Sequence, residues 1–298
     1  GLNWFLGDDK YELNLQSCPS NQTYSSNYDY YRGLEKFSEK EIQSIRDFVI
    51  DKQFLLSIAY HSSRSGCVSE RVIYPWGWAD NSVDSVKMSP DYNVIEEIAE
   101  NLANNIRKES SSQSYIPRAQ KSRTGNAHDW IYSETGCIQF LIEMGTSNIQ
   151  PMDQSIIDDT IERNREGLFY LLHEASGTGP DTRHLTGIIS EYMSGVLLDS
   201  VEVRILELHS QVLKPRLTDS FGRFHRLIPL GYYTLEFIKE GYEGKIINNV
   251  SINSGQSETL DIELIPLQQH NVTFICEACQ EFSENVMIEL IDTNGYQN

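Results

Sequence analysis

His61 and Glu143 are the two side chains whose places in the sequence best suit chemistry. His61 directly follows an almost unbroken apolar run, residues 54–60, which is typical of a strand buried on both faces. Glu143 lies near the end of a second apolar run, residues 137–144, where a carboxylate is costly unless it is paired, hydrogen-bonded or functional. Ligands of open α/β sheets bind just beyond the carboxyl ends of the strands. Both residues are therefore predicted to lie where a reaction could take place.

Three amphipathic helices are predicted to surround these two strands. The first begins with Ser38 as N-cap and Glu41 as its capping-box partner, the second follows Pro90 and Asp91, and the third covers about residues 152–175. The order helix–strand–helix–strand–helix predicts an α/β layered domain with a largely parallel or mixed sheet. Apolar residues at helical spacing are expected to face that sheet: Ile42, Ile45, Phe48 and Val49, then Val94, Ile95, Ile98, Leu102 and Ile106, then Ile156, Ile157, Ile161, Leu168 and Leu171.

The pattern changes after residues 177–180, whose sequence Gly-Thr-Gly-Pro predicts a linker. From residue 185 to 267 the chain has short strand-like runs with alternating apolar residues and evenly spaced turn signals. This pattern predicts a small antiparallel β-sandwich. Residues 268–298 are expected to begin a further β-module. The predicted domains are thus 1–178, 185–267 and 268–298, and the predicted fold class is an α/β/α layered mixed sheet followed by an all-β sandwich.

Charge and cysteine content exclude some classes of function. The formal net charge of −19 argues against nucleic acid or an anionic membrane as partner, because both require a basic surface. No apolar run approaches the roughly 18 residues of a membrane span. The five cysteines leave an odd thiol, and Cys67 could pair with Cys137. Cys276 and Cys279 form a CxxC without a second such pair, so a closed zinc site is not expected there.

Three segments, taken in order, resemble the zinc carboxypeptidases of the carboxypeptidase A/B type. They are FSEKEIQSIRDFV before the first strand, AYHSS followed by VIYPWGW, and GNAHDW with Tyr132 followed by FLIE. The sandwich, with LTGII and DSFGRFHRLIPLGYYTLEFIKEGY, is similar to the transthyretin-like domain of the carboxypeptidase N/E/D branch. The sequence NRE at residues 164–166 resembles the motif of the preceding helix. The resemblance covers about residues 15–267.

The resemblance implies a hydrolase that removes the C-terminal residue of peptides or proteins, with Zn²⁺ as cofactor. His61 matches a zinc ligand of the family, and Glu143 matches the general base that activates the zinc-bound water and then protonates the leaving amine. Three residues are expected to contact the substrate. His128 falls at the floor of the pocket for the C-terminal side chain, Ser62 adjoins His61, and Lys121 stands where the family has a mobile Tyr.

The sequence also departs from the family pattern. None of its seven histidines is followed by Glu at the third position, so the HxxE motif with the other two zinc ligands is absent. The Asn-Arg pair that clamps the substrate carboxylate is not visible either. Both absences indicate that the N-terminal half of the catalytic domain is missing, whereas Lys121 is a real divergence. We therefore expect an incomplete zinc site and an inactive isolated chain, whose parent enzyme acts extracellularly, in the secretory pathway or in a periplasm.

Two other interpretations of the sequence remain open. The chain could be a non-catalytic peptide-binding or adhesion protein on a degenerate carboxypeptidase fold, which the Lys121 substitution favours. Alternatively, His61 and Glu143 could be ordinary buried polar residues, which predicts that their side chains lie far apart or turn away from any shared cleft. For the tryptophans of the VIYPWGW segment we expect a packing role rather than a carbohydrate platform.

Overall fold

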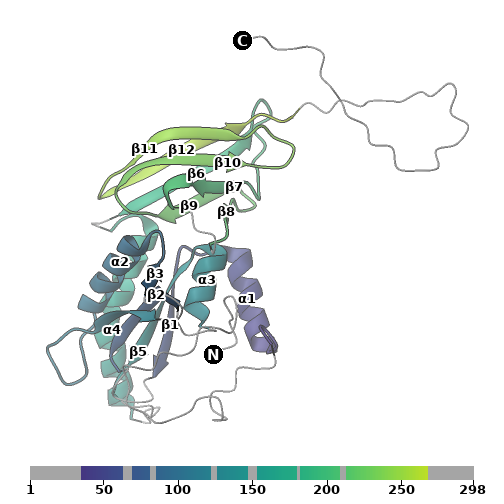
Figure 1. The fold of residues 1–298 in the computed structure, drawn as a ribbon. Coiled ribbons are helices and arrows are strands. Elements are labelled where there is room, and N and C mark those ends of the chain that lie inside the picture. The colour runs from purple at the N-terminus through teal and green to yellow at the C-terminus, as the bar shows by residue number, and fades with distance from the viewer. Residues whose placement is uncertain are drawn as a thin grey trace, which may run out of the picture. The chain divides into compact units, whose positions relative to one another are not determined.

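The computed structural model describes residues 35–62, 69–80, 85–121, 126–146, 153–179, 182–208 and 213–267, and of residues 62, 76–80, 85–88, 120 and 121 the backbone only. The described residues up to Pro266 belong to one compact unit. In that unit an α/β layer is followed along the chain by two small β-sheets (Figure 1). This order confirms the predicted fold class.

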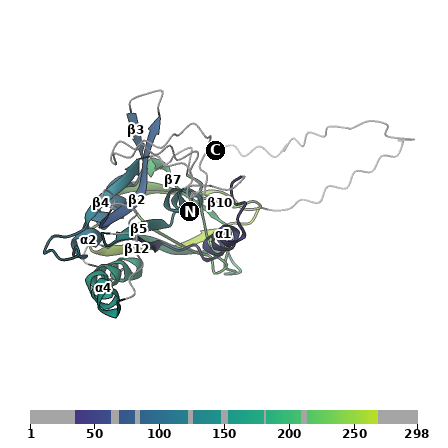
Figure 2. The ribbon, with the colours of Figure 1, turned by 90° about the horizontal axis from the view of Figure 1, so that it is seen from below.

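The α/β layer contains a mixed sheet to which the described chain contributes five strands. They are β1 (Leu56–Ser62), β2 (Arg71–Asp80), β3 (Ser85–Met88), β4 (Ile116–Lys121) and β5 (Ile138–Met144). β1 runs parallel to β5, and β5 runs antiparallel to the beginning of β2. β2 also runs parallel to β4, and its later half pairs antiparallel with β3 in the hairpin seen at the top of Figure 2. The carboxyl ends of β1 and β5 and the start of β2 therefore lie at one edge of the sheet.

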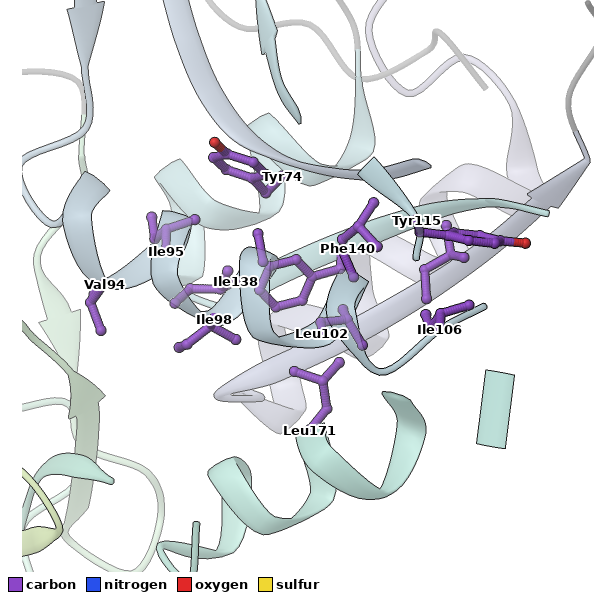
Figure 3. Packing of buried hydrophobic residues seen from close by; sticks show 14 of the residues in the cluster. Tyr74, Val94, Ile95, Ile98, Leu102, Ile106, Tyr115, Ile138, Phe140 and Leu171 are labelled. Atoms are coloured by element: carbon purple, nitrogen blue, oxygen red, sulfur yellow. The ribbon is translucent and has the colours of Figure 1, made fainter. Parts of the chain in front are cut away.

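Helices cover both faces of this sheet. α2 (Tyr92–Asn104) and α4 (Gln154–Ser176) lie on one side of it, and α1 (Lys40–Lys52) and α3 (Ala127–Thr135) on the other (Figure 1). The larger core forms between α2 and the sheet, where Ile98 and Leu102 meet Phe140, with Leu171 of α4 behind the helix (Figure 3). A smaller core joins Val49 of α1 to α3 and to the start of β5. The inward face predicted for α2 is confirmed, since Val94, Ile95, Ile98, Leu102 and Ile106 are all buried.

Gly167 allows α4 to approach α2 closely. A Cβ at this position would lie 2.6 Å from Ile106 Cγ1, so Gly167→Ala is expected to overpack the helix contact. We expect the free energy of unfolding to fall by about 1–2 kcal/mol, net of the better helix propensity of Ala. Urea denaturation measures it, with Gly244→Ala as control, because the nearest atom to a Cβ there is 3.9 Å away. Equal unfolding midpoints for the two variants would contradict the tight packing.

β1 differs from the prediction of a strand buried on both faces. Its described residues are half-buried or exposed, and Tyr60 is 44% exposed. Within the described chain β1 pairs with β5 alone, at the edge of the sheet. An apolar run predicts a strand, but it does not distinguish an edge strand from a central one, because that depends on which other segments pair with it.

The first and third helices also differ from their predictions. α1 begins at Lys40, and its N-cap is Glu39, which makes no side-chain capping bond, rather than the predicted Ser38, whose Oγ donates to Glu39 Oε1. Several residues expected to face inward are exposed: Ile45, Phe48, Ile156, Ile161 and Leu168. The buried positions of α4 are Leu171, as predicted, and the unpredicted Arg163, Asn164, Gly167 and Glu174. A polar stripe that makes specific hydrogen bonds has replaced the apolar stripe on its inner face.

The β-sandwich follows the predicted strands closely. One sheet has the order β11-β10-β7-β8 and the other the order β12-β6-β9, and apolar residues from both form a second core. Not every pair is antiparallel as predicted, because β12 runs parallel to β6. The strands are β6 (Arg183–Glu191), β7 (Glu202–Ile205), β8 (Arg216–Leu217), β9 (Arg223–Leu227), β10 (Gly231–Ile238), β11 (Lys245–Ile252) and β12 (Gln256–Leu264).

Candidate functional site

His61 and Glu143 lie side by side at the carboxyl ends of β1 and β5. The two strands are parallel, and in their register His61 is the direct partner of Glu143. Directly paired residues project from the same face of a sheet, with Cβ atoms about 5 Å apart. His61 Nδ1 accordingly lies 3.2 Å from Glu143 Oε2. This contact excludes a large separation of the two side chains, which is one of the two outcomes that the interpretation as ordinary buried polar residues predicted.

The two members of this pair differ in exposure. The His61 side chain is 52% exposed, whereas the Glu143 side chain is 11% exposed. Both side chains project from the face opposite the core beneath α2. β5 lies between β1 and β2, whereas β1 pairs with β5 alone in the described sheet, so Glu143 has covering strands on both sides and His61 on one. Glu143 is thus a largely sheltered carboxylate beside a more exposed imidazole.

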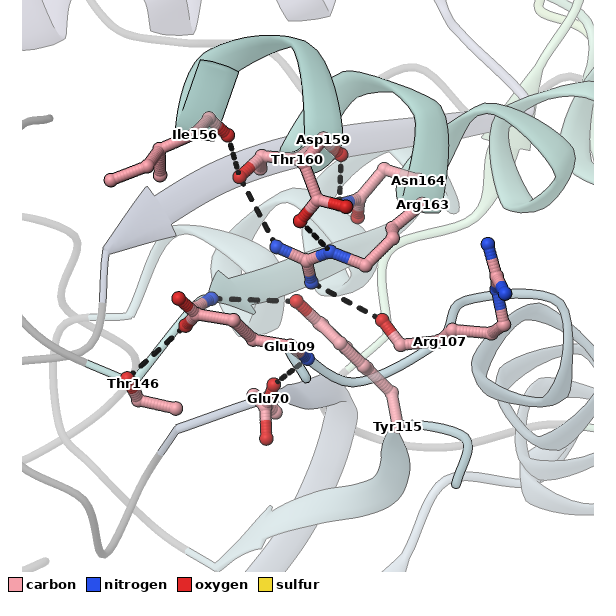
Figure 4. A network of polar contacts seen from close by, with 11 residues as sticks. Glu70, Arg107, Glu109, Tyr115, Thr146, Ile156, Asp159, Thr160, Arg163 and Asn164 are labelled. Atoms are coloured by element: carbon pink, nitrogen blue, oxygen red, sulfur yellow. Dashed lines mark hydrogen bonds and ion pairs between the residues drawn. The ribbon is translucent and has the colours of Figure 1, made fainter. Parts of the chain in front are cut away.

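A polar network holds the segment that follows Glu143 (Figure 4). The Tyr115 hydroxyl accepts a hydrogen bond from Gly145 N at 3.4 Å, and Thr146 Oγ1 donates to Glu109 Oε2 at 3.1 Å. Nearby, the buried Arg163 of α4 pairs with Asp159 at 2.7 Å and donates to the carbonyl of Arg107. The end of β5 is therefore attached both to the loop after α2 and to the residue before β4.

Tyr115 is a packed residue rather than a mobile one. It is 3% exposed and belongs to the core shared by the sheet and α2. Burial raises the pKa of its phenol above the ordinary value, so the hydroxyl is protonated at neutral pH. Its packing in the core distinguishes Tyr115 from the mobile Tyr of the family.

His128 is buried at the start of α3. It is 3% exposed, and its Nε2 lies 3.6 Å from Oδ1 of Asp129. Burial raises the pKa of Asp129 well above the ordinary value, while a hydrogen bond from Asn126 lowers it. Both side chains of this pair are thus buried in the described structure. The predicted place of His128 beneath a substrate side chain stays a prediction.

Two other predicted substrate contacts are described by backbone alone. Ser62 ends β1, and Lys121 ends β4 opposite Gly77 of β2. Their side chains lie outside the described part of the structure, as do residues 63–68 with Cys67. Cys137 is a buried, free thiol, and the disulfide considered between Cys67 and Cys137 involves a residue outside the described part of the structure. Burial raises the pKa of this thiol to about 11.

The described residues do not make a complete zinc site. Catalytic zinc is bound by three protein ligands of the His, Cys, Asp or Glu type. Among the residues that the structure describes, no three such side chains come together. His61 and Glu143 converge, but no third ligand joins them in this part of the chain.

A cavity of about 710 Å³ lies away from this pair. Its lining includes Gln53, Glu134, Arg216 and His225, and neither His61 nor Glu143 is part of it. The cavity and the His61–Glu143 pair thus indicate different places for a functional site. We place the site at His61 and Glu143, because catalysis depends on reactive atoms that meet.

Sequence comparison assigns residues 8–167, more than half of the chain, to the zinc carboxypeptidase family. The chain belongs to the zinc carboxypeptidase family. Carboxypeptidase D of Mus musculus is 25% identical over 142 residues, which is 48% of this chain and 9% of that protein. Carboxypeptidase D of Drosophila melanogaster is 22% identical over 241 residues, which is 77% of this chain and 16% of that protein. The chain thus matches a small part of the length of these relatives.

Solved structures resemble the chain over a short stretch. A type II cohesin–X-dockerin complex from Acetivibrio cellulolyticus has a TM-score of 0.23 at 22% identity and covers 28% of this chain and 56% of that chain. The C-terminal domain of a shaft pilin from Lactobacillus rhamnosus GG has a TM-score of 0.20 at 9% identity and covers 28% and 98%. Scores this low carry no argument about function.

Arg71 is the neighbour of this site that reasoning from the sequence missed. Its backbone pairs directly with Glu143 across β5 and β2. The register of two antiparallel strands 72 positions apart leaves no local signal in the sequence, because it is set by the folded sheet. The segment around Arg71 did not show the alternation that would have identified a strand there.

Proposed function

We propose that this chain carries part of the catalytic domain of a zinc-dependent exopeptidase that hydrolyses the C-terminal peptide bond of peptides or proteins. The observation that carries the proposal is the contact of His61 Nδ1 with Glu143 Oε2 at 3.2 Å, at the carboxyl ends of two adjacent parallel strands. Membership of the zinc carboxypeptidase family supports the class of reaction.

Glu143 is the general base in this proposal. Its carboxylate takes a proton from the water that attacks the scissile carbonyl carbon. It then returns that proton to the amine nitrogen as the C–N bond breaks. The small exposed fraction of its side chain, 11%, suits a group that exchanges a proton with one water rather than with bulk solvent.

His61 is proposed as one ligand of the zinc ion in the intact enzyme. The chain as given is not expected to hold catalytic zinc or to hydrolyse peptides, because its sequence has no HxxE and the described residues group no three ligands. His128, Ser62 and Lys121 are proposed as contacts to the substrate.

A second candidate is a non-catalytic protein that binds peptide termini on a degenerate carboxypeptidase fold. The incomplete ligand set among the described residues and Lys121 in place of the family's Tyr favour it. The two candidates differ in one outcome. A full-length protein that releases C-terminal amino acids and is inhibited by a chelator is the enzyme, whereas one that binds peptides and leaves them intact is the binding protein.

Zinc analysis of this chain tests the incomplete site. After incubation with zinc and gel filtration, we expect well below one zinc per chain, and no difference between the wild type and His61→Ala. Tight binding of one zinc per chain that His61→Ala abolishes would contradict the incomplete site.

We also propose the domain boundaries 1–178, 185–267 and 268–298, with a transthyretin-like domain in the second and the start of another β-module in the third. The last segment lies outside the described residues. An extracellular, secretory or periplasmic location is part of the same proposal. Among the helices that the structure describes, none is both long and apolar enough to span a membrane.

A further inference from the structure

Arg71 completes a polar row across three strands of the sheet. His61 of β1 pairs with Glu143 of β5, and Glu143 pairs with Arg71 of β2. Directly paired positions share one face of a sheet, so the imidazole, the carboxylate and the guanidinium project from the same face. Glu143 is the middle member of the row. A positively charged side chain thus stands beside the proposed general base, on the side away from His61.

A second guanidinium lies diagonally next to this row. β2 runs parallel to β4, and in their register Ile73 pairs with Arg118. Because Ile73 is two residues after Arg71, Arg118 projects from the same face one position further along the sheet. Arg71 and Arg118 are therefore neighbouring cations, with Glu143 as their acidic neighbour in the described sheet.

The surroundings of Arg71 leave it short of polar partners. Its Nε is buried and makes no hydrogen bond within the described part of the chain. Burial and the charge of Arg118 both lower the pKa of Arg71, whereas the charge of Glu143 raises it. Arg71 is half-buried and Arg118 beside it is exposed, so an anion that binds Arg71 from the side of Arg118 would be attracted by both charges. The planar guanidinium is suited to a carboxylate, which it can bind through two parallel hydrogen bonds.

We propose that Arg71, assisted by Arg118, binds the C-terminal carboxylate of a peptide and so positions that peptide beside Glu143. This inference rests on the proposed function for its choice of substrate class, and it assigns carboxylate recognition to residues other than the Asn-Arg pair that the sequence lacks. In this role Arg71 is a substrate-binding residue, and the contact involves hydrogen bonds and charge without any covalent step.

Peptide binding to the whole chain tests the proposal. The probes are three versions of one fluorescent peptide, measured by anisotropy: with a free C-terminal carboxylate, with a C-terminal amide, and with a C-terminal amide plus one internal Glu. We expect the free-acid peptide to bind about ten-fold or more tightly than either amide, because a charge-assisted bond to a guanidinium is lost in both. The proposal would be overturned if the free-acid peptide bound no more tightly than the plain amide, or no more tightly than the amide with the internal Glu.

Variants of the chain identify the residue responsible. Arg71→Gln is expected to remove the preference for the free acid, and Arg71→Lys to retain part of it, because a lysine keeps the charge without the two-pronged geometry. Arg165→Gln removes a similar charge from the exposed face of α4 and is expected to change nothing. A preference that survives in a folded Arg71→Gln, as judged by circular dichroism, would overturn the assignment.

The outcome is separable from that of the proposed function. Glu143→Gln is expected to keep the free-acid preference, because the amide leaves the Arg71 guanidinium in place. If the preference is found and the full-length protein has no peptidase activity, Arg71 retains its role and the proposed function fails. If the full-length protein has peptidase activity and Arg71→Gln binds the free-acid peptide as the wild type does, the proposed function stands and the role of Arg71 fails.

Discussion

Glu143→Gln in the full-length carboxypeptidase that we propose this chain belongs to is expected to lower kcat by about 10²–10⁴-fold. The amide has the shape of the carboxylate but cannot take up the proton of the attacking water. KM is expected to change little, because the lost interaction acts in the transition state rather than in substrate binding. Steady-state hydrolysis of a peptide with a free C-terminus measures both constants.

Two further variants make this prediction specific. Glu100→Gln removes one carboxylate from the exposed side of α2, so its kcat is expected to equal that of the wild type. Glu143→Asp keeps the base but withdraws it by one methylene, so kcat is expected to lie between those of the wild type and Glu143→Gln. If Glu143→Gln retained the wild-type kcat, Glu143 would not be the base and the proposed mechanism would be wrong.

Arg216→Met is expected to lower the free energy of unfolding by about 1–3 kcal/mol. Arg216 is 8% exposed, and it donates to the carbonyls of Tyr132 and Ser133 at the end of α3. Burial lowers its pKa to about 9, still well above neutral pH, so the guanidinium remains charged and stabilises the negative end of the helix dipole. Methionine has a similar volume but removes the charge and these hydrogen bonds, so that the Tyr132 and Ser133 carbonyls keep only their backbone donors, Gly136 N and Lys214 N.

Gly136, the C-cap of α3, leaves space for the Arg216 guanidinium to pack against the end of the helix. Gly136 has φ +79°, and a Cβ there would lie 2.1 Å from Arg216 Nε, so both the backbone conformation and the space require glycine. Arg223→Met is the matched control for Arg216→Met, because Arg223 is 58% exposed and pairs with Asp219 on the surface. Chemical denaturation compares them. Equal unfolding free energies for the two variants would contradict a structural role for Arg216.

Arginines of the sandwich contact the α/β layer at more than one point. Besides Arg216, Arg226 of β9 pairs with Asp91 at the start of α2 at 3.3 Å, and both side chains are largely buried. Arg183 of β6 forms an ion pair with Glu97 of α2. The β-sandwich therefore contributes to the stability of the helices that cover the sheet, although its described residues supply no part of the His61–Glu143 pair.

Particular elements show why some predictions from the sequence succeeded and others failed. α2 was predicted with its correct inner face because one side of it is apolar throughout and meets an apolar sheet. The inner face of α4 was predicted correctly at Leu171 and wrongly in its first half, where Arg163 and Asn164 are buried through hydrogen bonds to Asp159, Arg107 and Thr160. Periodicity records apolar character, and it does not register a polar residue whose burial is made favourable by its partners.

The sequence by itself determined the strands that end in His61 and Glu143, most strands of the sandwich and the resemblance to zinc carboxypeptidases. Each of these depends on residue types within a short window. Only the tertiary structure decided that β1 is an edge strand of the described sheet and that His61, Glu143 and Arg71 form one row. Those facts depend on the register of backbone hydrogen bonds between segments about 70–80 residues apart, which no local pattern encodes.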